Sequence, residues 1–297
     1  MSEKTPLKAW ILLFTLSLIW GSSFILIKRG LVGLSSMEVG ALRIFSAGLV
    51  MLPMAIGRIK LLPQKDLKYL FVIAMAGSFI PSFLFAIAQT QMPSALVGVL
   101  NAITPIFTIL ISVIVYKQRK DKRVWIGVLV GFVGTAILIT NGSFKSLSAI
   151  NSYSLLIIAA TIFYAINGNV IKFHLSHLPA VTIASVTLVF GGVLSGLYLV
   201  FFSEFFNRVF ASSETLHASY YIILLGILGT AVALIIFNRL VQVTDPVFTS
   251  SVTYIIPIIA ILWGVWDGEV LSNLHFIGIA LILIGVYITN KLGSKTQ

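Results

Sequence analysis

The chain has 297 residues, of which 58% are hydrophobic and 10% are charged, and its mean hydropathy is +1.05. A soluble domain could not bury so much apolar surface, so the composition excludes a soluble globular protein and indicates a polytopic membrane protein. The chain has no cysteine, which excludes disulfides, thiolate metal sites and thiol nucleophiles. Its formal net charge of +11 would suit nucleic acid, but the positions of the basic residues argue against that partner.

Apolar runs between charged or turn-rich breaks predict ten transmembrane helices, because about twenty apolar residues cross a bilayer. The first run, from Trp10, lacks a small-residue cleavage pattern and is interpreted as a retained span. Residues 141–152 are the predicted linker in the middle of the chain, and 203–216 are predicted to form a solvated external loop. The predicted spans are 10–28, 37–57, 67–89, 94–116, 123–140, 153–172, 180–203, 217–239, 246–266 and 273–290.

The basic residues indicate which side of the membrane each loop occupies. With a cytoplasmic N-terminus, fifteen of them lie on the cytoplasmic side and four on the other, and Arg43 alone lies inside a span. The positive-inside rule expects this asymmetry, so we predict that both the N-terminus and the C-terminus are cytoplasmic. The basic cluster 117–123 is interpreted as a topology signal; binding of anionic lipid headgroups is the weaker alternative.

Three groups of residues occur twice in the same order. Residues 77–113 match 229–265 at an offset of 152, and the densest part reads I-x-P-I-x-x-I-L-x-x-V in both copies. The end of the first span returns in the sixth span at an offset of 144. A pair of glycines seven residues apart is also repeated, since Gly127 and Gly134 return as Gly278 and Gly285.

These matches predict an internal duplication, with copies at residues 8–141 and 152–291. Each copy contains five predicted spans, and an odd number makes the second copy enter the membrane from the opposite side. The predicted fold class is therefore an all-α integral membrane protein of ten transmembrane helices, built as two inverted five-helix repeats. Such repeats are typical of secondary transporters, whose site lies at the interface between the repeats.

Polar and aromatic side chains inside the spans are the candidate binding residues, because an unpartnered polar group in hydrocarbon is costly. Aromatic rings and amides coincide at equivalent places in the two copies, which favours a cavity lined from both. The alternative is that hydroxyls and amides merely hydrogen-bond helices together, at about 1 kcal/mol each. The five residues predicted to contact a solute are Trp20, Asn101, Tyr164, Asn167 and Tyr254.

Prolines and glycines are predicted to shape the helix packing. Pro105 and Pro257 lie inside apolar runs, where a proline frees a carbonyl one turn earlier, so we expect kinks that shape the cavity. Other positions have the small-xxx-small spacing that lets helices approach closely. These positions are Gly127, Gly131, Gly134, Gly192 and Gly196.

Arg43 is the one basic residue well inside a span, where its burial costs roughly 2.5 to 3.5 kcal/mol on insertion scales. Two interpretations remain open for this structural or gating residue. It pairs with Glu38, which lies five residues earlier, or its side chain extends to the lipid headgroups.

The acids and histidines lie at the ends of spans. His174 and His177 have a spacing that could bind a metal, but no carboxylate or thiolate accompanies them, so we predict no metal site. Asp267 and Glu269 are predicted to lie in an exposed acidic loop. No acid lies at mid-membrane to carry a proton or to serve an intramembrane enzyme, so we expect no catalytic residue and no cofactor.

Three stretches carry a resemblance to a known family. They are W-G-S-S-F-I-L-I-K from Trp20 to Lys28, G-x-L-G-T-A from Gly226 to Ala231, and Tyr254 to Glu269 with its proline. With these the chain resembles the EamA family, the ten-helix branch of the drug/metabolite transporter superfamily, over nearly its whole length. One departure is that W-D-G-E ends the ninth span, whereas V-Y-K-Q-R stands at that place in the first copy.

The resemblance implies an integral inner-membrane carrier of small organic solutes, often amino acids or other metabolites moving outward. It also implies a central cavity lined by the first, third, fourth, sixth, eighth and ninth spans. The sequence therefore predicts a transporter that works by alternating access, with a small solute and the lipid bilayer as partners, no nucleic acid, and an oligomeric state compatible with a monomer. A passive facilitator or a lipid-like flippase is the alternative, and an intramembrane enzyme or a scaffold ranks below it.

Overall fold

The computed structural model describes residues 7–140, 152–243 and 252–293, and within these ranges every regular element is a helix. The predicted linker, apart from Ser152, lies outside the described residues. Seven helical segments are long and apolar enough to cross a membrane, and three shorter apolar helices accompany them. The chain is therefore an all-helical protein whose helices suit a membrane.

The long segments follow the apolar runs of the sequence, and several are divided into consecutive helices. They contain α1 (Leu7–Gly21), α2 (Ser23–Gly30), α3 (Ser36–Ile59), α4 (Gln64–Ala74), η1 (Met75–Phe79), α5 (Ile80–Ala88), α6 (Ser94–Asn101), α7 (Thr104–Ile114), α9 (Ser152–His174), α10 (Ala180–Phe201), α12 (Ser213–Leu224), η3 (Leu225–Val232) and α13 (Ala233–Val243). The shorter apolar helices are α8 (Val124–Thr140), α15 (Val252–Trp266) and α16 (Asn273–Gly293).

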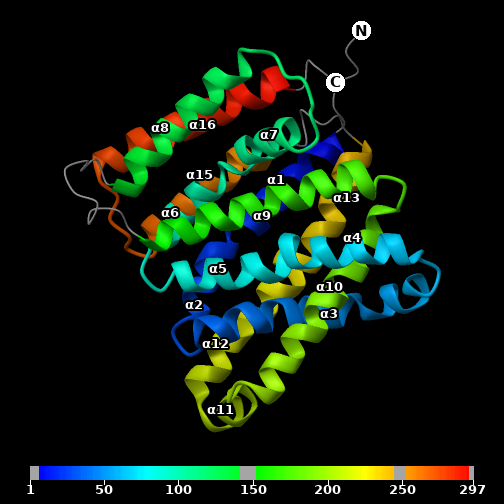
Figure 1. Cartoon of the computed structure of the whole chain (residues 1–297). Coiled ribbons are helices and arrows are strands. Elements are labelled where there is room, and N and C mark those ends of the chain that lie inside the picture. The colour runs from blue at the N-terminus through cyan, green and yellow to red at the C-terminus, as the bar shows by residue number, and fades with distance from the viewer. Residues whose placement is uncertain (1–6, 141–151, 244–251, 294–297) are drawn as a thin grey trace.

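Two helix pairs pack closely along their lengths, α8 with α16 and α3 with α10 (Figure 1). A Cβ added at Gly285 would lie 2.4 Å from the backbone nitrogen of Gly131, and one at Gly48 would lie 2.6 Å from the carbonyl oxygen of Leu188. Backbone atoms cannot turn aside as a flexible side chain can, so only glycine fits these contacts. The packing role predicted for Gly131 and its neighbouring glycines is confirmed.

Two π-helical segments, η1 and η3, interrupt two of the long helical segments. Gly77 lies in η1 and Gly229 lies in η3, and these glycines are the two members of one sequence repeat, 152 positions apart. A π-helical turn shifts carbonyl groups out of the α-helical hydrogen-bonding register, and such turns are frequent at functional sites. The duplicated glycines therefore mark an equivalent distortion in each half of the chain.

The segment predicted as a solvated external loop, 203–216, is folded. It contains the short helix α11 (Phe205–Ala211), in which the side chains of Phe205 and Val209 are buried. The apolar residues Phe205 and Val209 recur at helical spacing, so a helix can bury both on one face. The prediction was wrong in expecting a loop, because it rested on the charged residues alone, although most residues of the segment are exposed.

Candidate functional site

The π-helix η3 holds two side chains from the first half of the chain. The indole Nε1 of Trp20 donates a hydrogen bond to the carbonyl of Gly229 at 3.1 Å. The Nε of Arg43 donates to the hydroxyl of Thr230 at 3.2 Å. Adjacent residues of η3 thus anchor an aromatic ring and a guanidinium group.

The π-helix η1 has a matching contact with the second half of the chain. A Cβ added at Gly77 would lie 2.6 Å from the side-chain oxygen of Asn167, so the amide sits directly against this glycine. Ser23, which precedes Asn167 by 144 positions, lies against Gly229, where an added Cβ would be 3.2 Å from the serine hydroxyl. The contacts at η1 and η3 are therefore related in the same way as the two sequence copies.

Aromatic rings connect the helices around Tyr164. The Tyr164 ring stacks on Phe85 with 5.9 Å between centroids, and Phe85 in turn lies 6.0 Å from Phe24. Trp20 packs against Phe237 at 5.6 Å. Tyr164 also lies within electrostatic reach of Arg43. The structure therefore brings three of the sequence-predicted residues, Trp20, Tyr164 and Arg43, to one region.

Two amides have buried side-chain atoms without a hydrogen-bonding partner among the described residues. The side-chain oxygen of Asn101 has no partner, and its backbone carbonyl accepts from the hydroxyl of Thr104 at 2.7 Å. Gln89, whose residue is 7% exposed, has no partner for either its amide nitrogen or its amide oxygen. Because buried polar groups are nearly always paired, such amides are candidates for contacts to water or a ligand. Gln89 was not among the predicted site residues, since an amide at a span end carries no signal of burial.

Tyr254 lies away from the group around Arg43. Its hydroxyl is 3.4 Å from the carbonyl of Val286, and its ring lies 6.3 Å from that of Tyr287, so it faces α16. The two prolines also differ in setting. Pro105 follows a break between α6 and α7, whereas Pro257 lies inside the continuous helix α15.

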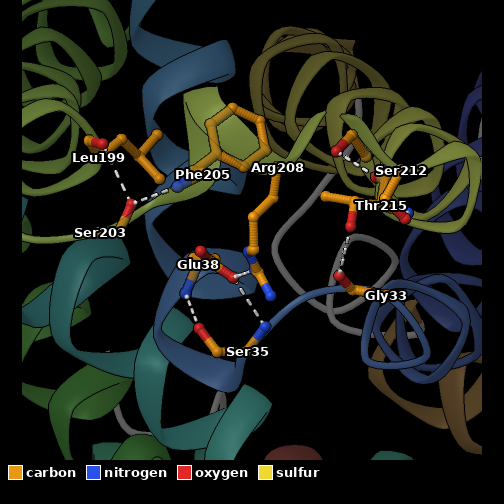
Figure 2. Close-up of polar contacts among 10 residues, drawn as sticks. Gly33, Ser35, Glu38, Leu199, Ser203, Phe205, Arg208, Ser212 and Thr215 are labelled. Carbon is orange, nitrogen blue, oxygen red and sulfur yellow. Dashed lines mark hydrogen bonds and ion pairs between the residues drawn. The ribbon is translucent and has the colours of Figure 1, made fainter. Parts of the chain in front are cut away.

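Glu38 belongs to a different ion pair from the one considered in the sequence. Its carboxylate accepts from the backbone N–H of Ser35 at 2.9 Å, and its own N–H donates to the Ser35 hydroxyl, which forms a capping box at the start of α3. Figure 2 shows Arg208 reaching from α11 to the same carboxylate. The interpretation that pairs Arg43 with Glu38 is therefore wrong, because Arg208 neutralises Glu38.

The loop between α15 and α16 is tied down by its acids. The Nζ of Lys28 lies 2.6 Å from Asp267 and 2.7 Å from Glu269, whose side chains are 12% and 5% exposed. Glu269 also accepts from the backbone N–H groups of Ser94 and Ala95 at the start of α6. Burial raises the pKa of the Glu269 carboxyl, but the hydrogen bonds from Lys28, Ala95 and Ser94 outweigh it, so its pKa is lowered. The expectation that these acids lie in an exposed loop was therefore wrong, because both side chains are largely buried.

A shallow pocket of about 550 Å³ lies beside the Glu38 ion pair and contains none of the predicted solute-contacting residues. The pocket is lined by Val32, Gly33, Leu34, Ser35, Arg208, Ala211, Ser212, Glu214 and Thr215 (Figure 2 labels several of them).

The Nε2 of His177 lies 2.9 Å from a carboxylate oxygen of Asp66. The expectation that no carboxylate accompanies the two histidines was therefore wrong.

Comparison with known proteins gives a consistent picture. The model of the EamA-like transporter family matches residues 7–140 and again 151–291. YedA of Escherichia coli K12, named an uncharacterized inner membrane transporter, is 24% identical over 92% of this chain and 88% of its own length. YdfC of Bacillus subtilis, named an uncharacterized transporter, is 25% identical over 91% of this chain and 87% of its own.

A more specifically named relative comes from Streptantibioticus cattleyicolor. It is called a probable terminal-alkyne amino-acid exporter and is 23% identical over 97% of this chain and 95% of its own. A solved crystal structure matches the fold with a TM-score of 0.65 at 19% identity, over 97% of this chain and 98% of that chain. The fold is thus shared with a protein of known structure.

Proposed function

Because this chain belongs to the EamA-like transporter family, we propose that it is a secondary-type carrier of small organic solutes that works by alternating access. The proposed architecture has ten spans in two inverted five-helix repeats, residues 8–141 and 152–291. Both termini are cytoplasmic in the inner membrane in this proposal. The three short apolar helices, α8, α15 and α16, supply the spans that the seven long segments leave open.

The observation that carries the proposal is the matched pair of contacts at η1 and η3. In each, a glycine of a π-helix in one half meets a side chain from the other half, Gly77 with Asn167 and Gly229 with Ser23. A carrier that exposes one site to either side needs equivalent contacts between its two repeats. These duplicated contacts support a rocking motion around a site at the interface between the repeats.

We propose amino acids or related metabolites as solutes, moved outward. The name of the Streptantibioticus relative, a probable amino-acid exporter, favours this class. The proposed contacts combine aromatic rings with amides, which suits a solute with both apolar and polar parts. The proposed solute-contacting residues are Trp20, Asn101, Tyr164, Asn167 and Tyr254, and Arg43, Pro105 and Pro257 shape or gate the cavity.

Counterflow in proteoliposomes tests transport directly. Vesicles are loaded with a mixture of unlabelled amino acids, labelled amino acids are added outside, and uptake of the label is measured without an imposed ion gradient. A carrier accumulates label transiently, whereas a passive facilitator that acts as a channel equilibrates it without overshoot and a flippase moves labelled lipid instead. Tyr164→Ala and Asn167→Ala should reduce the overshoot with unchanged membrane insertion. Unchanged counterflow in both variants would discard this site.

Alternating access is tested separately by cysteine labelling, because the chain has no cysteine of its own. Ser94 is 1% exposed beside Glu269, so Ser94→Cys should react slowly with a hydrophilic maleimide and faster when a transported solute cycles the protein. Thr90→Cys is the control, since Thr90 is exposed at the same end. Equal labelling of Ser94→Cys with and without solute contradicts the opening of this end.

A further inference from the structure

Arg43 carries a positive charge inside the bundle and has no carboxylate partner among the described residues. The ion pairs found in the described part of the chain join Lys28 and Arg29 to Asp267 and Glu269, Arg208 to Glu38, and His177 to Asp66. None of them includes Arg43, although it lies about two turns inside α3. A charge at such a depth is costly unless an opposite charge meets it.

The hydrogen bond to Thr230 fixes the orientation of this guanidinium. A guanidinium has five N–H donors in one plane, and the single bond from Nε to Thr230 leaves the two terminal NH₂ groups for another acceptor. The backbone of α3 at Arg43 packs directly against η3, because a Cβ added at Gly226 would lie 2.5 Å from the carbonyl oxygen of Arg43. The fork is therefore held against η3 with its terminal donors unused by described residues.

The groups nearest to Arg43 suit a small organic anion. Tyr164 lies within electrostatic reach, and its hydroxyl makes no hydrogen bond to a described residue. Trp20 bonds to the carbonyl of Gly229, the residue before Thr230, and so places an aromatic ring beside the same turn. A cation and an indole thus bond to adjacent residues of η3, with the Tyr164 phenol within electrostatic reach of the cation.

The charge occurs in one half only. Gly48 and Gly192 are 144 positions apart and contact each other, so the offset of 144 relates α3 to α10. The equivalent of Arg43 is then Thr187, whose hydroxyl bonds to the carbonyls of Ile183 and Ala184 on its own helix. A solute bound between the halves therefore meets a positive charge on one side and a neutral helix on the other.

We propose that Arg43 binds the carboxylate of the transported solute through its two terminal NH₂ groups, with the hydroxyl of Tyr164 as a further donor. The proposal rests on the proposed function and narrows it to small organic carboxylates, including amino acids. Planar bidentate pairing with carboxylate is what a guanidinium does best, and a point charge does not replace it. The solute supplies the opposite charge that the described chain does not.

Thermal unfolding of the purified full chain in detergent tests the binding, with benzoate, benzylamine and chloride as probes at equal ionic strength. Benzoate should raise the unfolding temperature of the wild type, and benzylamine and chloride should not. Arg43→Gln should weaken benzoate binding by roughly tenfold to a hundredfold, as for a lost charge-assisted hydrogen bond. Without ligand this variant should unfold at the same or a higher temperature, because an uncompensated charge is removed. A merely structural arginine would lower it.

Two further variants make the test specific. Arg58→Gln removes the same charge from an exposed position on α3 and should keep the benzoate effect. Arg43→Lys keeps the charge but lacks the planar pair of NH₂ groups, so it should bind benzoate more weakly than the wild type. If Arg43→Gln does not fold, Arg43→Lys tests the carboxylate site in its place. Stabilisation by benzoate that is undiminished in the Arg43 variants, or that chloride or benzylamine reproduces, overturns the proposal.

Counterflow separates this inference from the proposed function. The matched probe is the amine that differs from an amino acid only by loss of its carboxylate. If wild-type vesicles transport the amino acid and prefer it to this amine, the carrier and the carboxylate site are both supported. If they transport the amine equally well, the carboxylate proposal fails and the carrier remains. If no amino acid or derived metabolite moves while benzoate binding depends on Arg43, the anion site remains and the proposed carrier of these solutes fails.

Discussion

The two ends of the bundle are held together by different chemistry. At one end Lys28 of α2 and Ser94 of α6 meet Glu269, whose side chain is 5% exposed, so a buried carboxylate joins the two halves. At the other end His177, with 57% of its side chain exposed, meets Asp66 across the halves. Both carboxylates are nearly buried, but Glu269 also accepts hydrogen bonds from the N–H groups of Ser94 and Ala95, whereas Asp66 faces a largely exposed imidazole.

Stacked rings also join the two halves at the second end. Tyr69 stacks on His174 with 4.3 Å between ring centroids, and Tyr116 stacks on Phe173 at 4.0 Å. Ring stacking is worth about 0.5 to 1.5 kcal/mol per pair, whereas leaving one partner of a buried ion pair alone costs more. Separating the two halves should therefore cost more free energy at the Lys28 end than at the His177 end.

Truncation of Glu269 should have the largest effect. Glu269→Ala removes the partner of Lys28 and the acceptor for two N–H groups at the start of α6, so we expect a loss of about 3 kcal/mol in stability. Thermal and denaturant unfolding in detergent measure it. Glu204→Ala is the control, because Glu204 is exposed and makes no side-chain cap bond. Similar losses in both variants would show that the Lys28 contact is not special.

Acid should weaken the same end by a smaller amount, because protonation removes the charge of Glu269 but leaves its side chain. Since the pKa of Glu269 is lowered in the folded state, the unfolded state binds the proton first as the pH falls. The stabilisation is complete above the ordinary glutamate pKa of about 4.3 and is lost as the pH falls through the lowered value. The unfolding temperature of the wild type should therefore fall more steeply below about pH 4.3 than that of Glu269→Gln. Parallel curves contradict this.

Loss of a ring at the second end should have a modest effect. Tyr116→Leu keeps an apolar side chain but removes the stack on Phe173, so we expect a loss of about 1 kcal/mol. Unfolding in detergent measures it against Tyr220→Leu, because Tyr220 is exposed on α12. A loss as large as that in Glu269→Ala would erase the contrast between the ends.

The pair of His177 with Asp66 at the second end should matter least. Asp66→Asn removes the charge that faces His177 and should cost roughly 0.5 kcal/mol, because the imidazole is exposed, so water and salt screen its interaction with Asp66. The cost should fall further when the unfolding is repeated at high salt. A salt-independent loss of several kcal/mol would mean that this pair is as enclosed as Lys28 with Glu269.

The helices could be predicted because hydropathy follows the chain locally. Every long helical segment coincides with an apolar run, and starts such as Ser36 and Ser94 follow a serine cap or a proline. The π-helices could not be predicted, because apolar composition does not specify whether a carbonyl bonds four or five residues onward. The repeated glycines at 77 and 229 marked their positions without revealing the distortion.

Long-range partners explain the errors at the charged residues. Glu38 lies five residues before Arg43 in the sequence, yet its partner Arg208 is 170 residues away. Glu269 caps a helix whose first residue, Ser94, precedes it by 175 positions. Local spacing suggests pairs along one helix, whereas these contacts depend on how distant segments pack. The sequence did identify Arg43 as the charge that requires explanation.

The seam between α8 and α16 has a consequence for the motions of the molecule. An added Cβ at Gly134 would lie 2.8 Å from the carbonyl oxygen of Gly278, and one at Gly278 would lie 3.0 Å from that of Gly134. With backbone directly against backbone, neither helix can slide past the other by a fraction of a turn without collision. The two helices are therefore expected to move as one unit, and the amide protons along their seam should be among the slowest to exchange with deuterium.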